Sequence, residues 1–276
     1  MASGRPLRHP RRRLPESVLL RADARRARRR IRRGSVFELE AALRPPTRVV
    51  ALSEVGYSTG YRAPVGEIGR IARDNGALFF LDGTQSLGAL ACDLRHVRPD
   101  VYAVDGYKWL LAPNGAAFAY VSKDLRKILP PAVIGWRSHK DWRNHANLHH
   151  GIPEFKEEAE RYEGGMLPFS LLYALEASVE LFLELGPDAV ERRVLELASA
   201  VRRVAVDLGG CVDSSPDSPI VTIRFPNQDA EAVAHRLADD RVLVAARRGN
   251  LRVSPHIYND EGDIERLRAS LVTLLS

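Results

Sequence analysis

Two short runs of consecutive apolar residues, each followed by an acid, most constrain the fold of this 276-residue chain. Residues 77–81 read Ala-Leu-Phe-Phe-Leu and precede Asp82, and residues 101–104 read Val-Tyr-Ala-Val and precede Asp105. Strands that are apolar on every residue are typical of parallel sheets buried on both faces. The chain is therefore predicted to form an α/β protein with a mostly parallel sheet and flanking helices.

Segments with helical periodicity separate these runs, and the alternation of strand and helix supports the same fold class. The predicted helices cover 36–43, 64–75, 168–185, 188–208, 230–238 and 263–275. Further strands are predicted at 48–52, 116–121, 220–225, 242–245 and 251–254. We expect an arm over 1–34, a large domain over 35–185 and a small C-terminal α/β domain over 186–276.

The arm differs in charge from the rest of the chain. Residues 1–34 contain thirteen arginines and two acids, so their net charge is +11 and the remaining 242 residues carry −5, although the whole chain is +6. Such a segment could bind nucleic acid or another anionic surface, or serve as a mitochondrial presequence. It lacks aromatic residues for base stacking, so a disordered, solvated arm is favoured over nucleic-acid binding.

Other features argue against several classes of protein. No apolar run approaches the roughly 20 residues of a membrane span, so no membrane partner is expected. Four histidines lie between positions 139 and 150, without the spacing or the carboxylate of a metal site, so no metal is predicted. The two cysteines, Cys92 and Cys211, need no disulfide framework, which indicates a reducing, cytoplasmic setting.

Charged residues of opposite sign follow the two apolar runs. Asp82 ends the first run, and the second leads into Asp105-Gly106-Tyr107-Lys108-Trp109. Ligands of open α/β sheets bind beyond the carboxyl ends of the strands. Lys108, flanked by aromatic residues, suits Schiff-base chemistry, and Asp82 suits pairing with a protonated ring nitrogen, as a pyridoxal phosphate (PLP) site requires. A simple Asp82–Lys108 salt bridge explains the spacing equally well.

Longer stretches resemble one enzyme family. The resembling segments are 52–65 (LSEVGYSTGYRAPV), 76–94 (GALFFLDGTQSLGALACDL), 101–121 (VYAVDGYKWLLAPNGAAFAYV), 161–186 (RYEGGMLPFSLLYALEASVELFLELG) and 247–260 (RRGNLRVSPHIYND). In this order they resemble class V aminotransferases, PLP enzymes of fold type I that include cysteine desulfurases and isopenicillin N epimerase-like proteins. The resemblance covers the chain from Ser35 onward and implies a fold type I large domain that is incomplete at its N-terminal side.

The resemblance implies a role for each candidate site residue. Lys108 would form the internal aldimine with PLP, and Asp82 would keep the pyridinium nitrogen protonated. Gln85 would hydrogen-bond the phenolic oxygen of the ring, and Arg252 would bind the α-carboxylate of an amino-acid substrate. His256 and Tyr258 are interpreted as structural. The predicted cofactor-binding residues are Asp82, Gln85, Asp105, Tyr107 and Lys108.

Several positions depart from the family pattern. Relatives often have His at position 54, Ser at 105 and Thr at 166, where this chain has Glu54, Asp105 and Met166. Relatives also carry an upstream stretch with a phosphate-binding loop, whereas this chain has the arginine-rich arm there. An acid facing the cofactor phosphate would weaken its binding unless cations offset the repulsion.

The leading functional prediction is a PLP enzyme with an aminotransferase- or epimerase-like reaction on an amino acid. A homodimer is expected, with residues 135–165 contributing to the interface. Desulfuration is disfavoured because Cys211, the only cysteine between Lys108 and Arg252, is interpreted as a buried core residue. The alternatives are a truncated, inactive remnant of such an enzyme and, more distantly, a nucleic-acid binder that uses the arm.

Overall fold

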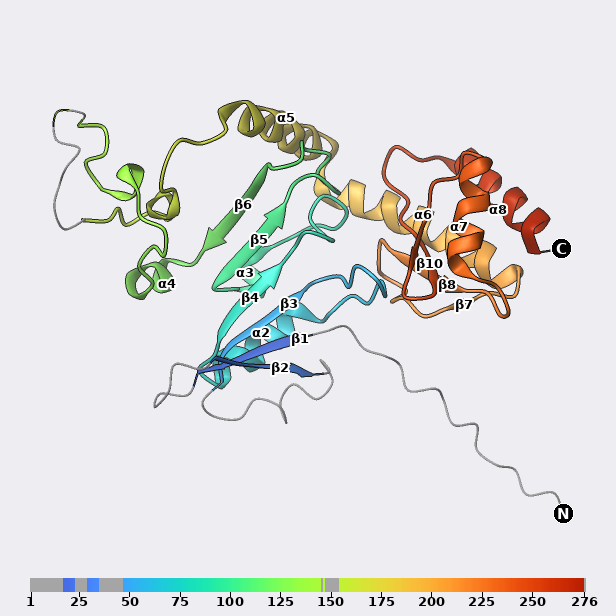
Figure 1. Ribbon diagram of the computed structural model, residues 1–276, viewed down its shortest axis with the longest axis horizontal. Coiled ribbons are helices and arrows are strands. Elements are labelled where there is room, and N and C mark those ends of the chain that lie inside the picture. The colour runs from blue at the N-terminus through green and yellow to red at the C-terminus, as the bar shows by residue number, and fades with distance from the viewer. Residues whose placement is uncertain (1–16, 23–28, 35–46, 145, 147–153, 276) are drawn as a thin grey trace, which may run out of the picture.

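The computed structural model describes residues 17–22, 29–34, 47–144, 146 and 154–275 (Figure 1). These residues form a large sheet with the strand order β2-β1-β3-β4-β5-β6. Its strands are β1 (Ser17–Ala22), β2 (Arg29–Gly34), β3 (Thr47–Ser53), β4 (Leu78–Asp82), β5 (Val101–Asp105) and β6 (Ala117–Val121). The central strands β3, β4 and β5 run parallel, and β1 and β6 pair antiparallel on either side. The predicted α/β architecture is confirmed.

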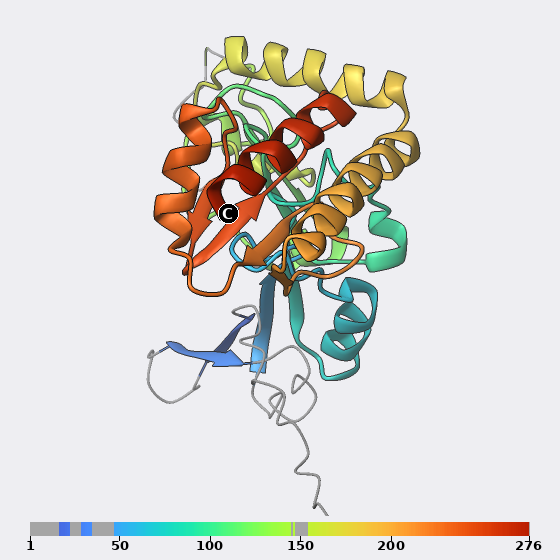
Figure 2. The same cartoon turned by 90° about the vertical axis from the view of Figure 1, so that its right-hand side faces the viewer.

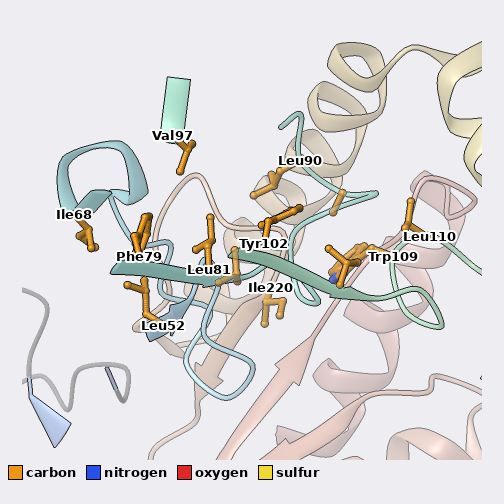
Figure 3. Packing of buried hydrophobic residues seen from close by; sticks show 14 of the residues in the cluster. Leu52, Ile68, Phe79, Leu81, Leu90, Val97, Tyr102, Trp109, Leu110 and Ile220 are labelled. Carbon is orange, nitrogen blue, oxygen red and sulfur yellow. The ribbon is translucent and has the colours of Figure 1, made fainter. Parts of the chain in front are cut away.

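The apolar run of β4 is buried unequally on its two faces. Phe79 and Leu81 are almost completely buried, whereas the alternate residues of the strand are half-buried. Helix α2 (Val65–Asp74) covers the fully buried face with Ile68, Ile71 and Ala72. Figure 3 shows Phe79 between Ile68 and Leu81 in this core. The prediction of burial on both faces therefore holds completely for only one face.

Of the remaining helices described before position 186, only the longest coincides with a predicted helix, the one at 168–185. They are α3 (Leu94–Val97), α4 (Lys123–Ile128), α5 (Phe169–Leu185) and the short 3-10 helices η2 (Trp136–Ser138) and η4 (Ala159–Tyr162). Helix α5 ends at Gly186, whose φ of +82° breaks the helix, and Pro187 begins the next one. The helix predicted at 36–43 lies outside the described residues.

A smaller α/β unit closes the chain (Figure 2). Its sheet has the order β7-β8-β10-β9, and three long helices pack on the same face. Its elements are α6 (Pro187–Asp207), β7 (Cys211–Val212), β8 (Val221–Arg224), α7 (Ala230–Asp239), β9 (Ala245–Arg247), β10 (Asn250–Val253) and α8 (Glu261–Leu275). The strand predicted at 242–245 is displaced, because the sheet pairing of β9 begins at Ala245.

Helix α6 joins the two units. Val190 and Val194 in its first turns belong to the core of the large unit, whereas Ala198 and Val201 belong to the core of the small unit. Ile220, just before β8, also packs into the large core, as Figure 3 shows. Residues after position 186 therefore contribute to the core of the large unit. The predicted domain boundary at 186 stays a prediction.

Strands β1 and β2 fall within residues 17–34 of the segment for which we predicted a disordered arm. They pair with each other, and β1 also pairs with β3 at the edge of the large sheet. Residues 1–16 of the predicted arm lie outside the described residues. Residues 17–22 and 29–34 extend the large sheet as strands, whereas disorder was predicted for them.

The segment between β6 and α5 has an aromatic centre. Arg137, Arg143 and Lys156 place their cationic groups 4.5, 4.3 and 4.9 Å from the ring centroid of Trp142. Arg137 and Lys156 are buried, and both form ion pairs with Glu160. Cation–π contacts and ion pairs thus hold this segment together. No cluster with metal-ligand composition occurs among the residues that the structure describes.

Candidate active site

Asp82 stands at the carboxyl end of β4 with its orientation fixed by two donors. The Ser53 hydroxyl donates to Oδ2 of Asp82 at 2.8 Å, and the backbone N–H of Thr84 donates to Oδ1 at 2.9 Å. Ser53 is opposite Asp82 in the parallel register of β3 and β4, which explains why the two side chains meet. Both carboxylate oxygens of Asp82 therefore accept a hydrogen bond, which fixes the direction in which the side chain points.

Lys108 follows β5, the strand next to β4. Its side chain does not pair with the carboxylate of Asp82. Nζ of Lys108 lies 5.3 Å from the ring centroid of Tyr107, and the side chain is half-buried. Within the described part of the chain, Lys108 forms no ion pair with Asp82 or with another acid. The simple salt-bridge interpretation of these two residues is therefore wrong.

Gln85 and Glu54 occupy the turn after β4 and the end of β3. Gln85 is buried, and its amide makes no hydrogen bond with another described residue, so the group can serve a ligand. Next to it, the Ser86 hydroxyl donates to Oε2 of Glu54 at 2.6 Å. Burial raises the pKa of Glu54, which is only 8% exposed. This buried pair anchors the turn that carries Gln85.

Asp105, at the end of β5, is tied to β4 through its backbone. Its N–H donates to Oγ1 of Thr84 at 3.1 Å. Its Oδ1 is buried and lacks a hydrogen-bond partner among the described residues. Thr84 thus links the ends of both strands. An unpaired acceptor is the wrong group to face a phosphate dianion, which brings no donor at neutral pH.

Arg252 reaches from the small unit to the loop that follows β3. Its Nη1 donates to the backbone oxygen of Tyr57 at 2.8 Å, and its Nε is buried without a partner among the described residues. Burial is the main cause that lowers the pKa of Arg252, followed by the nearby charge of Arg247. The guanidinium thus retains donors for an anionic ligand beside the candidate site.

His256 fixes the segment that carries Lys108. Its ring stacks on Trp109 with centroids 5.2 Å apart and on Tyr258 with centroids 4.7 Å apart. Nε2 of His256 lies 3.1 Å from the backbone oxygen of Trp109, and burial lowers the pKa of His256. The structural role predicted for His256 and Tyr258 agrees with these contacts.

Sequence reasoning missed three contributors to this arrangement. Ser53 and Thr84 orient the two strand ends. Thr84 adjoins the predicted Gln85, so its position was an available signal, whereas Ser53 meets Asp82 only through the register of β3 and β4. The third is the backbone oxygen of Tyr57, and no sequence pattern identifies a carbonyl contact of this kind. Tyr107, predicted as a cofactor contact, is 43% exposed and adjoins Lys108.

The interpretation of Cys211 as a buried core residue is wrong. Cys211 is exposed in β7 and lies opposite Arg224 of β8. Only two residues of β7 pair with the sheet, at its edge, so the strand covers little of the side chain. Burial is therefore no argument against a chemical role for this cysteine.

Comparisons with known proteins identify the family of this chain. The sequence profile of the family Aminotransferase class-V matches residues 29–273. Isopenicillin N epimerase of Amycolatopsis lactamdurans is 30% identical over 245 residues, which are 85% of this chain and 62% of that protein. A probable cysteine desulfurase of Methanothermobacter thermautotrophicus is 26% identical over 254 residues, with coverages of 84% and 62%. The chain thus spans about 62% of the length of these curated relatives.

Solved structures show the same fold. The apo cysteine desulfurase of Thermococcus onnurineus NA1 superposes with a TM-score of 0.78 at 22% identity, over 87% of this chain and 62% of that one. A C-DES variant with glycine covalently linked to its PLP cofactor has a TM-score of 0.77 at 24% identity, over 86% and 63%. None of the helices in the described ranges is both long and apolar enough to cross a bilayer.

Proposed function

This chain belongs to the class V aminotransferase family, whose members use pyridoxal phosphate, and we propose that it acts on an amino acid in an aminotransferase- or epimerase-like reaction. One observation carries the proposal. Lys108 and Asp82 emerge from adjacent parallel strands, and they do not neutralise each other within the described part of the chain. Because the chain spans about 62% of its curated relatives, the activity of the whole protein is part of the proposal.

The side chains of the site suit three groups of PLP, namely the aldehyde, the ring nitrogen and the ring oxygen. Lys108 offers an amine without an acidic partner for covalent attachment, and Asp82 offers a carboxylate already oriented by Ser53 and Thr84. Gln85 offers a buried amide for the ring oxygen. Asp105 does not fit a phosphate contact, because its unpaired Oδ1 would repel the dianion. We therefore assign to Asp105 only its backbone link with Thr84.

When bound, PLP supplies an electron sink that stabilises negative charge at the α-carbon of an amino acid. Asp82 would hold a proton on the ring nitrogen, which keeps that sink effective. Arg252 would orient the substrate by its carboxylate, through the parallel donors of the guanidinium. Nζ of Lys108 would hold PLP, and the same amine would move the proton at the α-carbon of the substrate.

Exposed apolar residues at both ends of the segment 135–165 support the proposed homodimer. Val133, Ile134 and Met166 are 73%, 54% and 73% exposed, and they flank the segment 135–165. Exposed apolar groups of this size are typical of protein interfaces. The mass of the particle in solution, measured by light scattering at micromolar concentration, tests this assignment. The mass of a single chain would contradict it.

The proposed activity is tested by titrating PLP-loaded protein with amino acids and following the visible absorbance of the cofactor. Arg252→Lys should keep the cofactor spectrum but weaken amino-acid binding by about 2–5 kcal/mol, because lysine cannot form two parallel bonds with a carboxylate. Arg266→Lys is the matched control, since Arg266 lies exposed on α8 in the helix layer.

Two outcomes would contradict the proposal. If neither wild type nor control responds to any amino acid although both bind PLP, the chain holds cofactor without substrate, and the remnant alternative is favoured. If Arg252→Lys binds amino acids as tightly as wild type, the carboxylate is held by another residue.

A further inference from the structure

The face of the small sheet that meets the large unit carries closely spaced arginines. In the antiparallel register, Arg252 pairs with Ala245, and Asn250 pairs with Arg247. Opposed residues of an antiparallel pair share a face, and side chains alternate along each strand. Arg247 and Arg252 therefore project from the same face, as diagonal neighbours on adjacent strands. Leu251 and Val253 point to the opposite face, where they pack against the helices.

This arginine face is directed toward the candidate active site. Arg252 contacts the backbone of Tyr57, and the Thr222 hydroxyl lies 3.5 Å from the backbone oxygen of Ser58. Thr222 is the register partner of Arg252 on the other side of β10. The row of Thr222 and Arg252 thus lies against the loop after β3. Asn250 and Arg247 form the next row on the same face, and Arg247 is exposed there.

The positive charge of this face is uncompensated within the described residues. Neither Arg247 nor Arg252 forms an ion pair there, and their hydrogen bonds go to backbone oxygens of Ala246 and Tyr57. The acid that strand register brings closest on this face is Asp213, which Thr222 separates from Arg252. Like charges that are neighbours on a sheet destabilise it. Two bound anionic groups would remove that repulsion.

From this arrangement we propose that the substrate carries a second anionic group, which Arg247 binds while Arg252 holds the α-carboxylate. The chemical class of this substrate is an acidic amino acid, aspartate or glutamate. A guanidinium suits this role because it stays charged and can donate two parallel bonds to a carboxylate. The inference rests on the proposed function and names the substrate class of the same site.

The test compares L-glutamate with L-glutamine, which differ in the charge of the distal group. PLP-loaded full-length protein is titrated with each, and the spectral change reports the apparent affinity. Wild type should bind glutamate at least roughly tenfold more tightly than glutamine, the effect of one hydrogen bond to a charged group. Arg247→Gln should remove this preference without changing glutamine affinity, and Arg247→Lys should keep part of it.

A matched control and a measurement without cofactor separate the possible failures. Arg266→Gln makes the same charge change in the helix layer and should keep the preference. Equal affinities in wild type, or a preference that survives Arg247→Gln, would overturn this inference alone. Absence of any spectral response would overturn the proposed function instead. Calorimetry with glutarate and its monoamide then tests the arginine pair directly, and equal binding of the two would overturn the inference.

Discussion

Replacing His256 with alanine removes the contact that joins the lysine-bearing segment to the small unit. His256 is 5% exposed, stacks on Trp109 and Tyr258, and places Nε2 3.1 Å from the Trp109 backbone oxygen. Each aromatic stack contributes about 0.5–1.5 kcal/mol and the hydrogen bond about 1 kcal/mol. The free energy of unfolding should therefore fall by about 2–4 kcal/mol. His235→Ala, on the exposed side of α7, should change it by less than about 0.5 kcal/mol.

The pH dependence of the His256→Ala effect gives a second check. Burial lowers the pKa of His256 from its ordinary value of 6.5, so the folded protein binds this proton less readily than the unfolded chain. The stabilisation by neutral His256 is thus present above about pH 6.5 and is lost as the pH falls through the lowered pKa. The raised pKa of Glu54 acts in the opposite direction, but it acts on both proteins and cancels in their difference.

The assay is urea-induced unfolding of wild type, His256→Ala and His235→Ala at pH 7.5 and pH 5.5. The difference between wild type and His256→Ala should be larger at pH 7.5 than at pH 5.5. A loss below about 1 kcal/mol at pH 7.5 would refute the reasoning that the stack holds this segment. A difference that grows toward acidic pH would refute the assigned direction of the pKa shift.

Two further predictions follow from a turn and a strand. Gly60→Ala should destabilise the fold by about 3 kcal/mol or more in thermal unfolding, because its φ is +62° and a Cβ there would lie 2.3 Å from the Ile220 backbone oxygen. Gly209→Ala, with φ +78° and open space around it, should cost only about 1–2 kcal/mol, and equal losses would contradict the clash. Cys211→Ser should leave the turnover of amino acids unchanged. Loss of sulfide release from L-cysteine would instead favour a desulfurase.

The framework of the site could be predicted because its determinants are local. The apolar runs before Asp82 and Asp105 predict strands whose carboxyl ends lie side by side, and the register of β4 and β5 confirms this. The Asn75-Gly76 stop predicts the end of α2, and Gly186 with Pro187 predicts the break between α5 and α6. The apolar pattern and the helix-ending residues determine secondary structure only within a few positions of themselves in the sequence.

What could not be predicted depends on contacts between distant segments. Val242 and Val244 are apolar and pack against the small core. Strand β10, however, pairs only with residues 245–247. Hydrophobicity therefore indicated the burial of these valines but placed the strand too early in the chain. The exposure of Cys211 depends on how few residues of β7 pair with the sheet. The bond from Arg252 to the Tyr57 backbone joins positions 195 residues apart.

The central claim is that this chain holds PLP through Lys108, and reductive mapping tests it most directly. Purified full-length protein is incubated with PLP, reduced with borohydride, digested and analysed by mass spectrometry. We predict a visible absorbance band that reduction abolishes and a pyridoxyl group on Lys108. Lys108→Ala should lack both, whereas Lys123→Ala should behave as wild type, because Lys123 is an exposed residue at the start of α4. Protein that stays colourless, or modification spread over other lysines with Lys108 untouched, would contradict the account.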